Sequence, residues 1–311
     1  MLARGDRDRL KIPSCLNPEA LALTQPTQSI PVISSIADLA SSSDAWLVDV
    51  WGVIHNGVQP ISASGETCAQ FRAMGGYVVL LTNAPRPAAA VVEQLDRVGV
   101  RRDAYDAVLT SGDVTRGLVK SWADRPMYHI GPERDLGIFS DLDVQFSTSV
   151  EAEITVCTGL IDDETETPDD YATTLKALQR RGVLMLCANP DLKVERGDRI
   201  VHCAGGLAKA YESFGGEVIY SGKPHLPIYD LALDMISRGL GRSVEKQKIL
   251  AVGDGVLTDI AGAAAAELRS IFIASGIHVP HGQDLTGGIL DELFPAQMQG
   301  RPVAAMRALD W

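Results

Sequence analysis

Four short apolar runs constrain the fold of this chain more than any other feature. Each run lacks the polar alternation of a half-exposed strand, so both faces of the strand that it predicts are buried, as in a parallel sheet covered by helices. Helical patterns follow Pro227 and cover the alanine-rich stretch 260–268. Alternating strands and helices predict a doubly wound α/β fold. The runs are residues 46–48, 77–81, 249–252 and 270–273.

Polar residues stand where three of these runs end. Asp49 follows the first run, Thr82 and Asn83 follow the second, and Asp254 follows the third after one glycine. Ligands of doubly wound sheets collect beyond the carboxyl ends of the strands. We therefore expect these side chains to lie together at one edge of the sheet.

The length of the chain, 311 residues, exceeds the usual size of one domain, about 100–200 residues. The stretch between Asn83 and Lys223 contains strand candidates of its own, at 154–157 and 183–187. It either continues one large sheet or forms an inserted domain, and its length favours insertion because about 120 residues suffice for a small core. The expected units are an irregular arm over 1–30, a core over 31–86 and 204–311, and an inserted α/β domain over 87–203.

Charge and cysteine usage exclude several classes of function. The net charge of −12 and the pI near 4.9 disfavour nucleic-acid polymers and anionic membranes as partners. A small anionic substrate then requires a metal or local cations. No apolar run has the 18 or more residues of a membrane span, and the first residues resemble no secretory signal. Five widely spaced cysteines without a metal-binding pattern are typical of buried thiols, so we expect a cytoplasmic protein.

Asp49 and Asp254 are the candidate metal ligands. A carboxylate at the end of a buried strand is unfavourable unless a metal or hydrogen bonds replace the lost water. Each residue alone is more often a helix cap or a turn former. Together they form a suitable site for Mg²⁺, which typically takes one or two carboxylates plus substrate phosphate.

Thr82, Asn83, Lys223 and Asp259 are the candidate phosphate-handling residues. The Thr82 hydroxyl and the Asn83 amide could contact phosphate oxygens beside a helix N-terminus, although such a pair is usually a cap. Lys223 stands between Gly222 and a proline, where it would be a fixed cation beside phosphate or a solvated turn lysine. Asp259 could hold this lysine or a metal-bound water, or simply cap the next helix.

Four short segments follow one another along the chain: Asp49–Val53, Leu81–Asn83, Gly222–Pro224, and Gly253-Asp254 with Thr258-Asp259. In this order they resemble the four motifs of the haloacid dehalogenase (HAD) superfamily. The long insert, with Asn189-Pro190-Asp191, resembles the class IIA branch, the NagD-like and nitrophenylphosphatase-like hydrolases. The similarity extends over roughly residues 34 to 285 and implies a Rossmann-type HAD core with an inserted smaller cap.

The resemblance also implies a mechanism and a set of roles. Asp49 would attack phosphorus in line, and water would then cleave the aspartyl-phosphate. Mg²⁺ would be held by the side chains of Asp49 and Asp254 and by the backbone carbonyl of Trp51. Thr82 and Lys223 would bind phosphoryl oxygens, and Asp259 would orient Lys223 or a metal water.

The resemblance further implies a substrate and a partner. The substrate would be a small phosphorylated metabolite, and Asn189 and Asp191 would help to choose its leaving group. Caps of this branch often supply dimer contacts, which leaves a homodimer through the cap open.

One position departs from the superfamily pattern. Phosphatases of this superfamily normally carry a second aspartate two residues after the nucleophile, where it protonates the leaving oxygen, but this chain has Trp51. Loss of a general acid typically lowers the rate by about 10²–10⁴-fold. His55 is a possible replacement, although a packed histidine in the loop is the commoner case.

Three hypotheses remain open at this point. The first is a phosphatase in which His55, water or a substrate group replaces the missing acid. The second is a hydrolase restricted to acyl phosphates or phosphonates, whose leaving groups need no strong acid. The third is a non-catalytic protein that binds magnesium and phosphate as a sensor.

Overall fold

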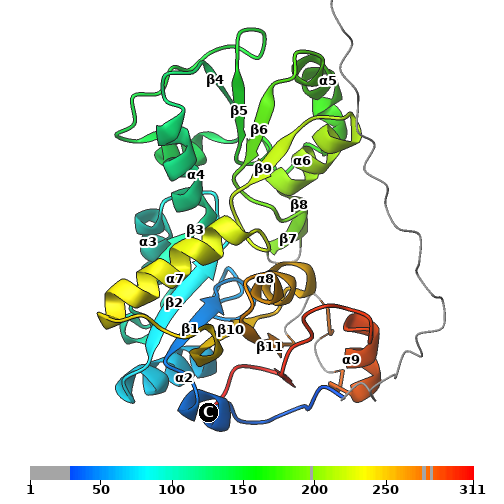
Figure 1. Cartoon of the computed structure of the whole chain (residues 1–311). Coiled ribbons are helices and arrows are strands. Elements are labelled where there is room, and N and C mark those ends of the chain that lie inside the picture. Colours follow the sequence, from blue (N-terminus) through cyan, green and yellow to red (C-terminus); the bar gives the residue numbers. More distant parts are fainter. Residues whose placement is uncertain (1–28, 197–198, 275–277, 281–282) are drawn as a thin grey trace, which may run out of the picture.

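The computed structural model describes residues 29–196, 199–274, 278–280 and 283–311. Within them, two parallel β-sheets form two stacked units, each covered by helices (Figure 1). No helix in these ranges combines the length and apolarity that crossing a membrane requires. Residues 1–28, which include nearly all of the expected arm, lie outside the described part.

The larger sheet has six parallel strands in the order β12-β11-β10-β1-β2-β3. From β1 the chain adds strands on one side as far as β3, and later resumes on the other side of β1 with β10. This order is that of a doubly wound sheet, and its switch point lies between β1 and β10. The strands are β1 (Ala45–Asp49), β2 (Tyr77–Thr82), β3 (Ala107–Thr110), β10 (Ile249–Gly253), β11 (Arg269–Ile273) and β12 (Ala304–Met306).

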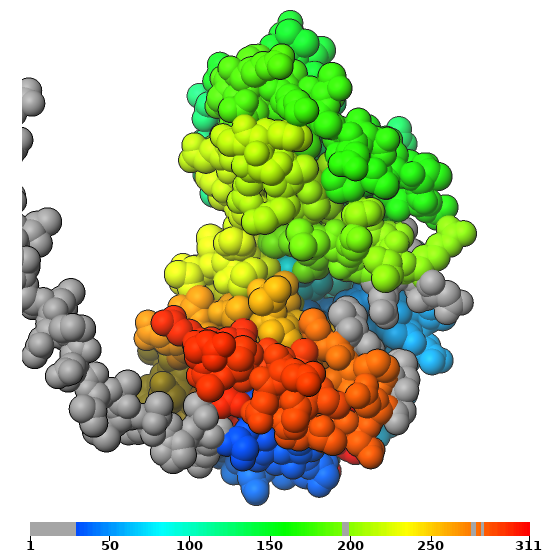
Figure 2. Space-filling view, turned by 90° about the vertical axis from the view of Figure 1, so that its right-hand side faces the viewer, coloured from blue at the N-terminus to red at the C-terminus, as the bar shows by residue number. Residues whose placement is uncertain are grey.

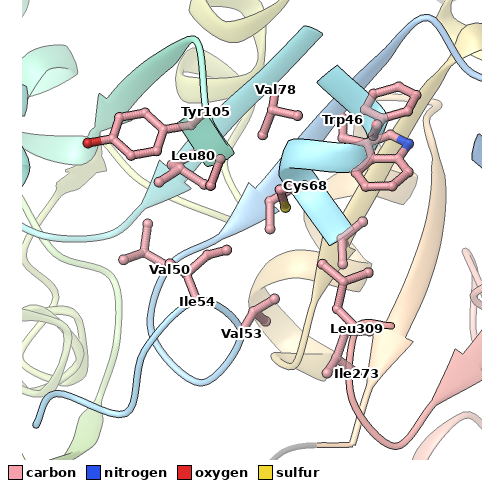
Figure 3. Close-up of a cluster of buried hydrophobic side chains, with 14 of the residues drawn as sticks. Trp46, Val50, Val53, Ile54, Cys68, Val78, Leu80, Tyr105, Ile273 and Leu309 are labelled. Carbon is pink, nitrogen blue, oxygen red and sulfur yellow. The ribbon is translucent and has the colours of Figure 1, made fainter. Parts of the chain in front are cut away.

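Helices cover both faces of this sheet, as the uninterrupted apolar runs predict. Successive residues of β1 point to opposite faces, so that Trp46 and Leu47 belong to different cores. The Trp46 ring stacks on Phe71 at 3.9 Å between centroids, in the core drawn in Figure 3. The first face packs against α1 (Ala37–Ser41), α2 (Ser62–Ala73) and α3 (Ala88–Val98), and the second against α4 (Ser111–Ser121), α7 (Leu226–Leu240) and α8 (Ala261–Ala265).

The smaller sheet has four parallel strands in the order β4-β5-β6-β9. One face packs against α5 (Ala172–Arg180) and α6 (Ala204–Ser213), and the other against a 3₁₀ segment, η2 (Glu133–Phe139). In Figure 2 this unit, in green, stands above the larger one. Its strands are β4 (Met127–Ile130), β5 (Ile154–Cys157), β6 (Leu184–Cys187) and β9 (Val218–Tyr220), beside the antiparallel hairpin β7 (Lys193–Arg196) and β8 (Arg199–His202).

Sheet pairing places the ends of the insert differently from the expected 87 and 203. β3 pairs with β2 in the larger sheet, and β9 pairs with β6 in the smaller one. Helix α4 joins the two units, because Val114 packs in the larger core and Val119 in the smaller. Strands as short as β3 and β9 carry a weak local signal, and only tertiary pairing assigns them to a sheet.

The remaining described elements complete the larger unit at the C-terminal end. Helix α9 (Gly287–Leu293) packs beside β12 through Leu290, together with Phe294, the residue that follows the helix. The cysteine prediction is confirmed where it is described, because Cys68, Cys157, Cys187 and Cys203 are all buried thiols. Cys15 lies outside the described residues.

Candidate active site

The candidate active site lies at the switch point of the larger sheet. Asp49 is the last residue of β1, and Asp254 follows the last residue of the neighbouring strand β10. The two strands are in register from Ala45 with Ile249 to Val48 with Val252. Parallel pairing therefore brings two carboxylates that are far apart in sequence to one edge of the sheet.

Lys223 stands at the centre of this cluster with its ammonium group buried. Its Nζ donates to Asp49 Oδ1, to Asp259 Oδ1 at 2.7 Å and to the Leu81 carbonyl at 3.0 Å. Burial acts to lower the pKa of Lys223, but the carboxylates of Asp259 and Asp49 outweigh it and raise this pKa above its usual value. The lysine is therefore a permanent cation held against Asp49.

The acidic cluster comprises Asp49, Asp254 and Asp259, each with a carboxylate oxygen within 4.8 Å of the others. Burial raises the pKa of Asp49; Lys223 opposes this shift, while Asp259 and Asp254 add to it. Three acidic side chains around one ammonium group repel one another when all of them are ionised. A bound cation would favour their ionised form.

Asp259 faces Lys223 from a short π-helical turn, η5 (Val256–Ile260). Its Oδ1 accepts from Lys223, and its Oδ2 accepts from the Gly255 N–H at 3.0 Å. A Cβ on Gly253 would lie 2.2 Å from the Asp259 side chain, so only glycine admits this approach. Both oxygens of Asp259 thus serve to hold the lysine and the loop.

Apolar side chains of the loop after Asp49 anchor this loop in the core of the larger unit. Val50, Val53 and Ile54 point into the core beneath the sheet edge (Figure 3). The half-buried Trp51 packs its ring against Gly57, where a Cβ would lie 2.6 Å away. The contacts of Val50, Val53 and Ile54 do not involve the Trp51 ring, so they would still hold this loop if position 51 changed.

Thr82 is the last residue of β2 and Asn83 follows it; both residues are buried beside this cluster. The Thr82 hydroxyl accepts from the Ala84 N–H at 3.2 Å. The Asn83 amide is occupied by protein partners: Oδ1 accepts from the Lys223 N–H at 2.7 Å, and Nδ2 donates to the Lys223 carbonyl at 3.1 Å. The Asn83 side chain thus contacts the backbone of the candidate phosphate-binding lysine.

The loop 189–191 reaches the same cluster from the insert. Asn83 Nδ2 also donates to Asp191 Oδ1 at 2.9 Å, and Asn189 Oδ1 accepts from the Asp191 N–H at 3.0 Å. Ser111 adds a bond that the sequence did not indicate, because its hydroxyl donates to the Ala188 carbonyl at 2.5 Å. A serine that begins a helix resembles a cap, so only the fold shows this role.

The chain matches two family models, one in each of two separate stretches of the sequence. Residues 46–145 match the model described as haloacid dehalogenase-like hydrolase, and residues 220–287 match a second one, HAD-hydrolase-like. A hydrolase of the haloacid dehalogenase-like family from Brucella suis 1330 has 43% sequence identity and a TM-score of 0.80. The alignment covers 89% of this chain and 99% of that one. This chain belongs to the haloacid dehalogenase-like hydrolase family.

More distant structures share the fold of this HAD-like hydrolase. A possible sugar phosphatase from Cytophaga hutchinsonii has 20% identity and a TM-score of 0.73, over 89% of this chain and 97% of that one. The 4-nitrophenylphosphatase of Thermotoga maritima has 22% identity and a TM-score of 0.65, over 87% and 96%. No curated protein sequence gives a significant match.

His55 is packed within its own loop in this HAD-like hydrolase. Its Nδ1 accepts from the Gly57 N–H at 2.8 Å, and its ring meets the Trp51 ring edge-on at 5.2 Å. Burial lowers the pKa of His55 to about 4, so the ring is neutral at neutral pH. A neutral ring that accepts from the backbone has no proton ready on that nitrogen for a leaving group.

This depressed pKa predicts a specific loss of stability in acid. His55 binds a proton near pH 6.5 in the unfolded chain but only near pH 4 in the folded one, so protonation favours unfolding. The stabilisation that comes from the neutral ring is intact above pH 6.5 and is lost as the pH falls toward 4. Between pH 7 and pH 5 this loss lowers the free energy of unfolding by about 2 kcal/mol. Urea unfolding at both values should show this difference between wild type and His55→Gln.

The other histidines are common to both proteins and cancel in this comparison. We expect His55→Gln to keep wild-type activity at neutral pH, since a neutral imidazole is too weak an acid to protonate a leaving group. Equal pH dependence of the two proteins would contradict the assignment of a buried neutral ring, and a variant without turnover would restore His55 as a candidate acid.

Proposed function

We propose that this chain is a magnesium-dependent phosphatase that hydrolyses a small phosphorylated metabolite with Asp49 as the nucleophile. One observation carries the proposal: Lys223 joins Asp49 and Asp259 at the switch point, within a cluster that also includes Asp254. A strand-end carboxylate beside a fixed cation can attack phosphorus while the cation holds the charge that develops on its oxygens.

The proposed reaction has two steps. An Asp49 oxygen forms a bond to phosphorus, and the ester bond breaks with its electron pair going to the leaving oxygen. Water then attacks the phosphorus of the aspartyl-phosphate, which releases inorganic phosphate and restores the carboxylate. Lys223 and the Thr82 hydroxyl would hold the phosphoryl oxygens through both steps, with Asp259 holding Lys223.

The donor set fits a hard divalent cation. Asp49 and Asp254 offer carboxylate oxygens, and the backbone carbonyl of Trp51, two residues after Asp49, would be a further oxygen ligand. Magnesium would supply charge neutralisation for the phosphoryl group when it is bound. Asp259 is less suited to be a direct ligand, because both of its oxygens already accept hydrogen bonds.

We assign the chain to the class IIA branch of the superfamily. The support is the insert itself, a parallel α/β unit that follows α4 and precedes the lysine segment. A nitrophenylphosphatase is among the proteins with the same fold over nearly their whole length. A cap of this kind beside the site suits a small phosphate ester rather than a polymer.

A second candidate function follows from Trp51. This position cannot donate a proton, and His55 is held neutral in its loop. Substrates whose leaving group departs as a stable anion, such as acyl phosphates, need no acid. The enzyme would then be restricted to such substrates, and phosphonates whose leaving group is similarly stable belong to the same set.

Phosphate release from p-nitrophenyl phosphate tests the proposed function, because nitrophenolate leaves without protonation. We expect turnover with magnesium, its loss on chelation with EDTA, and its recovery when magnesium is restored. Acetyl phosphate and an alkyl phosphate in the same assay separate the two candidates. Absence of turnover on a broad panel of phosphate esters and acyl phosphates would reject both.

A further inference from the structure

The Asn83 side chain uses all of its main hydrogen-bonding groups inside the protein. Oδ1 accepts from the Lys223 N–H, while the two hydrogens on Nδ2 go to the Lys223 carbonyl and to Asp191 Oδ1. The orientation of this amide is chemically determined, because the Lys223 N–H can only donate and therefore faces the oxygen. No amide hydrogen remains for a substrate oxygen.

Asp191 is held in place from several sides. Asn189 Oδ1 accepts from its N–H at 3.0 Å, and its carbonyl accepts from the Gly205 N–H at 3.1 Å. Close contacts support the same loop, since a Cβ on Gly222 would lie 2.4 Å from Asn83 Oδ1 and 2.8 Å from Pro190. The loop is thus fitted against the segment that carries Lys223.

A series of contacts connects the insert to the ammonium group of Lys223. Asp191 holds the Asn83 amide, the amide holds both backbone polar groups of Lys223, and the Lys223 side chain reaches Asp49 and Asp259. Removing the Asp191 carboxylate leaves one amide hydrogen without its partner and allows the amide to rotate. Rotation would release the backbone from which the ammonium group is aimed.

We propose that Asp191 is a positioning residue that orients the Asn83 amide and, through it, aims Lys223 at the phosphoryl group. The inference rests on the proposed function, and it assigns both residues to the support of the lysine rather than to contact with the leaving group. What the bond requires of residue 191 is an acceptor oxygen, not a negative charge. Asparagine can supply this oxygen, and alanine cannot.

The test compares Asp191→Asn, Asp191→Ala, Asn83→Ala and the double alanine variant in the full-length protein. Loss of a group that orients a binding residue typically lowers activity about 10–100-fold. We expect a decrease of this size in kcat for each alanine variant, with a smaller change in KM, and near wild-type kcat for Asp191→Asn. Because both alanine variants break one bond, the double variant should lose little more than either. Asp169→Ala, at an exposed carboxylate of the insert, is the matched control.

Binding of inorganic phosphate with magnesium, measured by calorimetry, gives a readout that does not need turnover. The alanine variants should bind phosphate more weakly than wild type, and Asp191→Asn should bind it equally well. A wild type that binds phosphate without turnover would reject the proposed function and leave the positioning role intact.

Two results would overturn the inference. If Asp191→Asn loses as much kcat as Asp191→Ala, and one limb of the pH profile disappears, Asp191 acts as an acid or base. If the alanine variants unfold at lower temperature but keep wild-type kcat and phosphate affinity, the bond only stabilises the fold.

Discussion

Replacing Asp49 with asparagine should abolish turnover of p-nitrophenyl phosphate, with a loss on the order of 10⁴-fold or more. An amide of the same shape keeps the packing at the end of β1 but cannot form the aspartyl-phosphate. Folding should be preserved, because burial already disfavours the charged form of Asp49 and Lys223 keeps its bond to Asp259. Steady-state kinetics and thermal unfolding of the two proteins measure both effects.

Asp254→Asn is the matched control for this prediction. This variant removes a carboxylate from the same cluster but keeps the nucleophile. It should bind magnesium more weakly, so raising the magnesium concentration should restore part of its activity. Acid-quenched wild type should carry a phosphoryl adduct on the peptide that contains Asp49, and Asp49→Asn should carry none at any magnesium concentration. Turnover by Asp49→Asn at even a tenth of the wild-type rate would exclude Asp49 as the nucleophile.

Replacing Trp51 with aspartate should raise turnover of an alkyl phosphate by about 10²–10⁴-fold, the usual contribution of a general acid. The anchored loop keeps the backbone at this position, so the new carboxyl group would stand beside the leaving oxygen. The gain should be smaller for p-nitrophenyl phosphate, whose leaving group needs no proton. Rates on both substrates, measured as a function of pH, test this expectation.

The variant Trp51→Asn separates the effect of a proton donor from the effect of the volume that the tryptophan ring leaves. Both variants remove the ring that packs on Gly57, so both should lose some stability and both open the same volume. Only the aspartate adds an acid. An equal gain in both variants would attribute the effect to room for the substrate, and no gain in either would mean that the proton comes from elsewhere.

The central strands and the convergence at their ends could be predicted from the sequence. The runs before Asp49, Thr82 and Asp254 are apolar on both faces, and only a sheet covered by helices satisfies such a pattern. Parallel strands in turn place their carboxyl ends together. The approach of Asp49 to Asp254 therefore follows from local pattern plus one topological rule.

The ends of the insert and the partners of Asn83 could not be predicted in this way. β9 has three residues, all half-buried, and nothing in its sequence indicates which sheet it joins. The Asn83 amide suggested a phosphate contact, but its partners lie 108 and 140 residues further along the chain. Pairings over such separations depend on how the two units meet, which residue type and spacing do not encode.

The split of the larger sheet around β1 has a consequence for synthesis on the ribosome. The strand that carries Asp49 is made early, but its neighbour β10 emerges only after the whole smaller sheet. The smaller unit is continuous in sequence and can fold as soon as it is complete, whereas β1 keeps one edge unpaired until the last quarter of the chain appears. A nascent chain stalled before β10 would therefore carry a finished smaller unit beside an open, aggregation-prone edge of the larger sheet.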